Sequence, residues 1–421
     1  MAISINDRLV EASKLLSRAA GSLNVLRGIN WAPAVRERFF AKGAAELPRV
    51  VYRQPDLSHI HELVKEVRPR LRGDVPELAY LRRQARSIAL TAALLESVGT
   101  RRFFELSKQL YGAPSDPLLD GKSTSLDLAR RIERTLSRLG AVDLGSEPEP
   151  RSPAHVAKEI RAAVDNMLGA DAPKVVLTGK IAAKASASPT KIRIRKNASF
   201  TKEDVQQLVM HEAMVHVATS LNARRQRLLP SLKVNHAGIT RTQEGLAVLS
   251  ELMSGSLGPS RLRRLATRAL AIQASIDGAD FMELYRYHLD RSEDPSHAFD
   301  DARRIVRGGL ITGGAPCTKD GVYLDGMVRV HNFMSSIVEL RRPDLLPLLF
   351  CGKLDLEDIP ALARLSKRGL VVPPLHMPPW AQDRRFIVSY LTYSGFLSRM
   401  RLARVRDHYA EALARCPNLS T

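Results

Sequence analysis

Two histidines and two glutamates carry the strongest chemical signal in this chain of 421 residues. His211 is followed directly by Glu212 and then by His216, and Glu244 comes further along the chain. Two imidazoles and a carboxylate can form a His₂Glu zinc site, which keeps a fourth position open for water. A glutamate directly after the first histidine is the general base of HExxH zinc peptidases. One interpretation is therefore a zinc ion bound by His211, His216 and Glu244, with Glu212 as the proton acceptor.

The spacing of the two histidines differs from that of HExxH, in which they lie four residues apart on one helix face. His211 and His216 are five residues apart. On a regular α-helix this spacing turns the side chains about 140° away from each other, so they could not share an ion. A π-bulge would return them to the same face. The motif alone leaves a second interpretation open, in which two helix histidines bind no ion and Glu244 is an acid that stabilises a helix start.

The flanking sequence predicts helices that would position these side chains. Thr201 and Asp204 have the spacing of a capping box, so a helix begins ahead of His211. Thr240 and Gln243 have the same spacing, which would place Glu244 in the first turn of a second helix.

Two short strands are predicted at 174–178 and 191–195, joined as a hairpin by a segment rich in Gly, Ala and Ser. The second strand would form an edge, to which an extended substrate backbone could add. Aromatic residues make up only 5% of the chain, a composition that favours packed helices over a sandwich or barrel. We therefore expect an α+β fold that is predominantly helical, with a small antiparallel sheet beside the metal-binding helix.

The remaining sequence has helical apolar patterns on both sides of a predicted linker. We expect these helices at 7–28, 57–70, 76–98, 101–111, 124–139, 381–399 and 401–415. Residues 146–154 are rich in Pro, Gly and Ser, which is typical of a linker. The predicted organisation is a helical N-terminal module at 1–145, this linker, and a catalytic domain at 155–421 on which the C-terminal helices pack.

Composition and charge restrict the class of protein. Hydrophobic residues make up 44% and charged residues 26%, which excludes a disordered or collagen-like chain. The net charge of +20 suits an acidic protein surface, nucleic acid or anionic membrane, but a GC-rich genome would also produce an excess of arginine. Cys317, Cys351 and Cys416 form neither a disulfide framework nor a CxxC motif. With no apolar stretch long enough to span a membrane, we expect a cytoplasmic protein.

Several motifs together resemble the bacterial QEGLA-motif proteins, which are often labelled flavohemoglobin-expression-modulating. That family is similar to the eukaryotic microtubule-associated tyrosine carboxypeptidases, which remove the C-terminal tyrosine of α-tubulin with an HExxxH zinc site. The resemblance extends from about residue 25 to 400. The matching positions are His211, Glu212, His216, Asn222, Gln226, 243–247 (Gln-Glu-Gly-Leu-Ala), 29–31 (Ile-Asn-Trp), Arg36, Phe39, 48–52 (Pro-Arg-Val-Val-Tyr), 304–309 (Arg-Ile-Val-Arg-Gly-Gly), Thr318, Lys319, Asp320, Tyr323, Leu324 and Gly326.

The resemblance implies that His211, His216 and Glu244 bind one Zn²⁺ and that Glu212 is the catalytic acid/base. This chain departs from the bacterial pattern at two places. Residues 213–215 are Ala-Met-Val, whereas the bacterial proteins usually have a small Gly and Thr beside the metal. Arg227 follows Gln226 where those proteins tend to have proline. The first departure bears on the choice of substrate more than on metal binding.

Further candidates follow from the chemistry of a carboxypeptidase, which must bind a free carboxylate. Arg304 and Arg307 offer bidentate guanidinium groups, and Lys319 and Tyr323 are four residues apart on a predicted helix. Tyr323 could donate a hydrogen bond to the oxyanion of the tetrahedral intermediate. The alternative is that these side chains are solvated at helix ends. Asn222 is either a substrate contact or a structural cap.

The predicted function is that of a zinc-dependent metallopeptidase, most simply a carboxypeptidase that removes one residue from the C-terminus of a peptide or protein. An acidic C-terminus would suit the basic chain. Two alternatives stay open at this stage. One is a metal-binding regulator or scaffold without turnover, in which the bulky residues 213–215 close the cleft. The other is a basic nucleic-acid-binding protein, although a recognisable binding motif is missing from the sequence.

Overall fold

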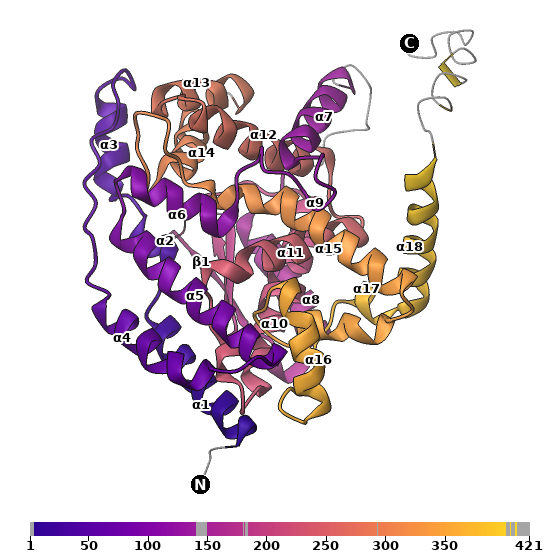
Figure 1. The fold of residues 1–421 in the computed structure, drawn as a ribbon. Coiled ribbons are helices and arrows are strands. Elements are labelled where there is room, and N and C mark those ends of the chain that lie inside the picture. The colour runs from indigo at the N-terminus through magenta and orange to yellow at the C-terminus, as the bar shows by residue number, and fades with distance from the viewer. Residues whose placement is uncertain are drawn as a thin grey trace.

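The computed structural model describes residues 4–139, 150–179, 181, 184–292, 294–400, 405 and 409–410. Within them the chain is predominantly helical, with a small sheet near its middle, as expected (Figure 1). The helices ahead of residue 140 are α1 (Ile5–Gly21), α2 (Val25–Gly28), α3 (Pro33–Ala41), α4 (Ser58–Val67), α5 (Pro76–Glu96), α6 (Arg101–Tyr111) and α7 (Ser125–Arg138). The central elements are α8 (Pro153–Leu168), β1 (Lys174–Thr178), β2 (Ala185–Ser188), β3 (Lys191–Arg195), α9 (Lys202–Leu208), a π-helix (Val209–Val217) and α10 (Ala218–Arg225). The later helices are α11 (Thr240–Met253), α12 (Pro259–Ile276), α13 (Phe281–Ser292), α14 (Pro295–Val306), α15 (Val322–Glu339), α16 (Ile359–Lys367), α17 (Pro379–Gln382) and α18 (Arg384–Arg399).

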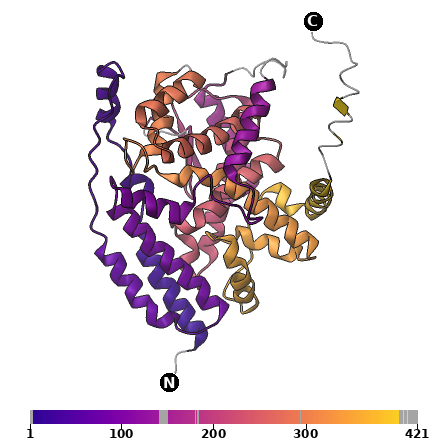
Figure 2. The same ribbon diagram turned by 45° about the horizontal axis from the view of Figure 1, so that its top comes forward.

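The N-terminal helices share a hydrophobic core with the second half of the chain. In Figures 1 and 2, α1, α4 and α5 lie side by side at the lower left. Their apolar faces bury Leu9, Ile60 and Leu81 completely, in the same cluster as Leu349 and Leu362. Burial of this kind stabilises a helix more than its intrinsic propensity does. The domain boundary near 145 stays a prediction, and residues 146–149 of the predicted linker lie outside the described residues.

The sheet differs from the predicted hairpin. Its strand order is β1-β3-β2, with β3 antiparallel to β2 but parallel to β1. The prediction missed β2, because Ala185–Ser188 has the small and polar side chains of a loop. In the sequence, β2 turns directly into β3 after two residues. The connection from β1 to β2 is longer, and β1 lies beside β3 only in the folded sheet. The predicted edge strand at 191–195 is therefore central, and its two edges are already paired.

The sheet packs against the helix that contains His211. Val175, Ile192 and Ile194 form a hydrophobic cluster with Met210 and Met214 of the π-helix. The predicted capping box is confirmed at the start of this helical run, where Thr201 accepts from the Asp204 N–H and Asp204 accepts from the Thr201 N–H. The sheet therefore supports one side of the helix that carries the two histidines.

Helix α11 and helix α15 approach each other closely at two glycines. A Cβ atom added to Gly245 would lie 2.6 Å from the Cα of Gly326, and one added to Gly326 would lie 2.9 Å from the Cα of Gly245. The predicted capping box at Thr240 is wrong, because a 3₁₀ turn at Ala237–Ile239 runs directly into α11 and no side chain caps the helix. Thr240 is the first residue of α11, so Glu244 follows one full turn into the helix.

The C-terminal helix α18 runs along the right edge of Figure 1 and confirms the helix predicted near 381–399. Most of the helix expected at 401–415 falls outside the described residues. Among the helices that the structure describes, each is too short or too polar to span a bilayer.

Candidate metal centre

The two histidines share one face of the helix because the helix between them is a π-helix. The wider turn extends over Val209–Val217, the segment that contains both residues. Their ring centroids are 4.9 Å apart and their planes are nearly perpendicular. The five-residue spacing is therefore compatible with a shared ligand, and the regular α-helical alternative does not apply to this segment.

Glu244 of α11 completes the cluster. Its Oε2 lies 3.5 Å from the Nε2 atoms of both His211 and His216. The three donor atoms lie within 4.8 Å of one another. In a tetrahedral zinc site with bonds of about 2.0–2.1 Å, the ligand atoms are about 3.3 Å apart. Both the residue types and the separations therefore fit a divalent ion of the zinc type.

The electrostatics of the cluster also favour a bound cation. Burial by itself would lower the pKa of His211, but hydrogen bonds with Glu244 and Glu251 outweigh burial and raise that pKa to about 9. Burial would likewise raise the pKa of Glu244, yet the two histidines keep it well below its usual value. Two carboxylates therefore stabilise positive charge at His211, and a bound metal ion could supply that charge in place of the proton.

A second carboxylate orients the first histidine from behind. Glu251 is completely buried, and its Oε1 lies 2.7 Å from the Nδ1 atom of His211. Arg261 donates two hydrogen bonds to Glu251, of 3.0 and 2.9 Å, and Gln207 donates a third of 3.0 Å. Burial raises the pKa of Glu251, but Arg261 and His211 lower it to about 2. The carboxylate thus fixes the imidazole so that Nε2 faces Glu244.

Sequence reasoning missed Glu251, although its position carries a usable signal. It lies seven residues after Glu244 on the same helix, and two turns of an α-helix return to the same face. Lys353 was also missed. Its ammonium group donates to the Thr219 hydroxyl at 3.1 Å and to Gln243 Oε1 at 3.3 Å. Burial lowers the pKa of Lys353 to about 8, against the opposing charges of Glu244 and Glu212.

Replacing Glu251 with Gln is expected to weaken metal affinity roughly 10- to 100-fold, because the amide is a weaker acceptor for His211. Competition against a chromogenic chelator measures this affinity. Glu62→Gln, on a side chain that is 72% exposed, is the matched control. An unchanged affinity in Glu251→Gln would show that the carboxylate has no influence on the metal.

Comparison with known proteins identifies the family of this chain. A family model described as microtubule-associated tyrosine carboxypeptidase matches residues 37–399, and this range includes every residue of the cluster. The chain belongs to that family. As a member of the tyrosine carboxypeptidase family, it is related to carboxypeptidase-type hydrolases. A search of curated proteins gave no match.

Two of the residues that were predicted to bind the substrate, Lys319 and Tyr323, lie beside the histidine cluster. The ammonium group of Lys319 is 3.9 Å from Glu244 Oε1. Tyr323, one turn further along, is nearly buried, and the charge of Glu244 helps burial to raise its pKa. The Arg268 guanidinium lies 5.7 Å from the centre of the Tyr323 ring and was not predicted. Lys319 and Tyr323 therefore border the metal cluster.

The two predicted arginines have different surroundings. Arg304 donates to Asp320 Oδ2 at 2.7 Å, so its charge is neutralised next to Lys319. Nε of Arg307 is buried and, within the described residues, has no hydrogen-bond partner. Arg304 consequently holds the turn that carries Lys319, whereas Arg307 keeps a donor for another group.

Two aromatic residues from the N-terminal part of the chain hold the loop after Arg307. The Tyr52 hydroxyl accepts hydrogen bonds of 2.7 Å from both the Trp31 indole and the Gly308 N–H. Gly308 adopts φ +84°, where a side chain is strained, and an added Cβ would collide with Phe103. Trp31 and Tyr52 therefore fix the backbone next to Arg307, a predicted substrate-binding residue.

Asn222 is a structural residue in this fold. Its side chain is fully buried and donates to the carbonyl groups of Phe350 and His376, at 2.9 and 2.7 Å. Its carbonyl oxygen accepts from the N–H groups of Leu375 and His376. Every polar position of the amide is occupied, so the contacts support the structural alternative over a substrate contact.

The bulky residues 213–215 do not face the histidine cluster. Ala213 and Met214 are buried in the core beneath the sheet, and Val215 is buried in the core shared with the N-terminal helices. The helix is therefore held between two hydrophobic cores. The hypothesis that these side chains close a substrate cleft stays a prediction, and their burial in the two cores does not favour it.

Proposed function

We propose that this protein is a zinc-dependent carboxypeptidase that hydrolyses the last peptide bond of a peptide or protein. The observation that supports it most is the convergence of His211, His216 and Glu244 on one point, with Glu212 beside them. Glu212 has no role in binding the ion, and a protein that only bound metal would not need it. The family match adds support from residues 37–399 rather than from the site alone.

The side chains divide the reaction between them. A bound zinc ion would polarise the scissile carbonyl and lower the pKa of water at the site. Glu212 would take a proton from the attacking water and deliver it to the nitrogen of the departing residue. The water oxygen bonds to the carbonyl carbon, the carbon–nitrogen bond breaks, and the products are a shortened chain and a free amino acid. Tyr323 would donate a hydrogen bond to the oxyanion.

Recognition of the terminal carboxylate would fall to the cations beside the cluster. Lys319 borders Glu244, and Arg307 retains an unpaired donor, whereas Arg304 is already bound to Asp320. A charge-assisted hydrogen bond from either cation would select a free C-terminus over an internal peptide bond. We infer that Arg304 acts through Asp320 and does not touch the substrate.

The substrate is proposed to be a polypeptide C-terminus of acidic character, since the chain carries a net charge of +20. The same charge motivates the alternative of nucleic-acid binding, which no feature of the described site favours. A cytoplasmic location stays a prediction.

The metal assignment is tested by elemental analysis of the purified protein. We expect about one zinc per chain in the wild type, and its loss in His216→Ala and in Glu244→Ala, because each variant removes one of three protein ligands. Circular dichroism would establish that the variants fold. A wild type without metal, or variants that retain it, would refute the ligand set.

The reaction is tested with a peptide library in which the C-terminal residue varies. Mass spectrometry should detect the loss of one terminal residue, and a chelator should stop the reaction until zinc is restored. The same peptides with an amidated C-terminus are the matched control and should not be cut. Equal cleavage of both sets would indicate an endopeptidase.

A further inference from the structure

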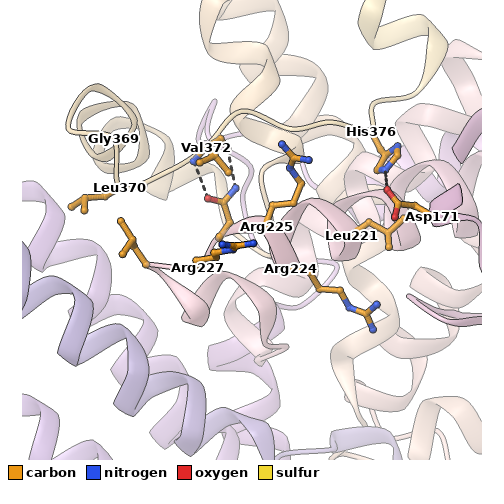
Figure 3. A pocket seen from close by; sticks show the side chains of 11 residues that line it. Asp171, Leu221, Arg224, Arg225, Arg227, Gly369, Leu370, Val372 and His376 are labelled. Carbon is orange, nitrogen blue, oxygen red and sulfur yellow. Dashed lines mark hydrogen bonds and ion pairs between the residues drawn. The ribbon is translucent and has the colours of Figure 1, made fainter. Parts of the chain in front are cut away.

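A cavity separate from the histidine cluster lies at the C-terminal end of α10 (Figure 3). Its volume is about 710 Å³, within the range of small-molecule sites. The end of α10, the following turn and the segment at 369–376 form its wall. The first arginine of this wall, Arg224, is eight residues beyond His216, or about 12 Å along a helix. The proposed peptidase function does not use this cavity.

Hydrogen bonds hold the wall in place. Gln226 is buried and exchanges two hydrogen bonds of 2.9 Å with the backbone of Val372, shown as dashed lines in Figure 3. On the other side, His376 Nε2 lies 2.8 Å from Asp171 Oδ2. The cavity is therefore preformed, so a ligand would not have to order its wall.

Three arginines surround the cavity with uncompensated positive charge. Arg224, Arg225 and Arg227 are all exposed, and within the described residues none of them forms a hydrogen bond or an ion pair through its side chain. The carboxylate of the wall, Asp171, is engaged by His376. Cations at the end of a helix are favourable for the helix dipole, which explains Arg224 and Arg225. Arg227 lies beyond the helix, where similar bacterial proteins tend to have proline, so the dipole does not explain it.

Four apolar side chains provide much of the remaining wall. The side chains that provide this surface are Leu221, Leu228, Leu370 and Val372. Leu228 is 44% exposed, so it is available to a ligand without rearrangement. An anion alone would leave this surface unused, and a cavity of this volume is larger than inorganic phosphate requires. The wall thus combines several guanidinium groups with contact area for an organic body.

We propose that the cavity binds an organic polyphosphate, that is, a phosphate ester with two or more phosphoryl groups and a planar apolar body. The planar guanidinium fork matches phosphate oxygens and also stacks on flat rings. Three arginines within a four-residue stretch can neutralise several charges at once, whereas a single carboxylate would engage only one fork. The apolar residues would pack against the organic body.

Calorimetric titration of the full-length protein at about 0.15 M salt tests the proposal, with magnesium adenosine triphosphate and pyrophosphate as the probes. We expect both probes to bind, and each single change Arg224→Ala, Arg225→Ala or Arg227→Ala to weaken binding roughly tenfold. Leu228→Ala should weaken binding of the nucleotide but not of pyrophosphate. Arg263→Ala, at an exposed arginine of α12, is the matched control and should leave binding unchanged.

Two further variants separate this site from the catalytic cluster. Arg307→Ala should bind both probes normally, and the triple arginine variant should keep wild-type metal content and peptide cleavage. The proposal is overturned if the wild type binds neither probe, if Arg263→Ala weakens binding as much as the pocket variants, or if Arg307→Ala alone abolishes it. Thermal denaturation of the triple variant establishes that it folds. Failure here would leave the peptidase assignment unaffected, because the residues that line the cavity are not part of the histidine cluster.

Discussion

Replacing Glu212 with Gln should abolish peptide cleavage while leaving the metal in place. The amide has nearly the shape of the carboxylate but cannot accept the proton of the attacking water, and loss of a general base costs on the order of 10³-fold in rate. The proposed ligands are His211, His216 and Glu244, so the metal content should stay at the wild-type level. The rate of product formation under saturating peptide, measured beside elemental analysis, gives both quantities.

Glu203→Gln is the control for this experiment, since Glu203 is an exposed acid in the first turn of the same helical run. That variant should cleave at the wild-type rate. If Glu212→Gln retains metal and full activity, then Glu212 is not the base, and the proton must pass through another group. If Glu212→Gln loses its metal, the ligand set itself would have to be revised.

Replacing Gly245 with Ala should destabilise the fold by about 3 kcal/mol or more, which is a large effect for one added methyl group. The new Cβ would lie against the Gly326 backbone, 2.6 Å from its Cα, and a backbone cannot move aside as a flexible side chain can. Helices α11 and α15 would have to separate at the position next to Glu244. We therefore expect a weaker metal site in addition to a lower midpoint of urea unfolding.

Gly21→Ala is the control for Gly245→Ala, because an added Cβ at this position of α1 has no atom within 4 Å. This variant should be as stable as the wild type or slightly more stable, since alanine is the better helix former. Equal stability of Gly245→Ala and the wild type would mean that the two helices tolerate a wider separation. Metal affinity measured on the same samples would then show whether Glu244 had moved.

Sequence periodicity predicted most helices well because their apolar faces are buried. The helix expected at 101–111 is observed at Arg101–Tyr111, where Phe103 and Leu106 face the core. The sheet was harder to predict, since Ala185–Ser188 gains its strand conformation from pairing with β3 and not from its own side chains. Similarly, Thr240 has the sequence of an N-cap, but the preceding turn at Ala237–Ile239 already continues into the helix.

The histidine cluster was predictable from residue types only if the helix contained a π-bulge, and helix propensity scales do not predict where such bulges occur. Its supporting residues were less accessible to sequence reasoning. Glu251 could be found from its helical spacing to Glu244, whereas Lys353 comes from a distant loop and contacts Gln243 only in the folded chain. Asn222 shows the opposite case, because a motif asparagine beside a site proved to anchor the backbone at 375–376.

The π-helix at Val209–Val217 is equivalent to one residue inserted into an α-helix. The wider turn absorbs the extra residue, so the side chains that follow keep nearly the orientation they would have after a shorter, regular α-helix. A comparison with HExxH enzymes must therefore open a gap inside a continuous helix, where gaps are least expected. Deleting one residue between the histidines would give the familiar four-residue motif, and a regular α-helix over the shortened segment would keep Asn222 and Gln226 facing the backbone that they hold. The two spacings therefore differ by one deletion that changes the π-helix into an α-helix, and lineages that carry them are separated by that single step.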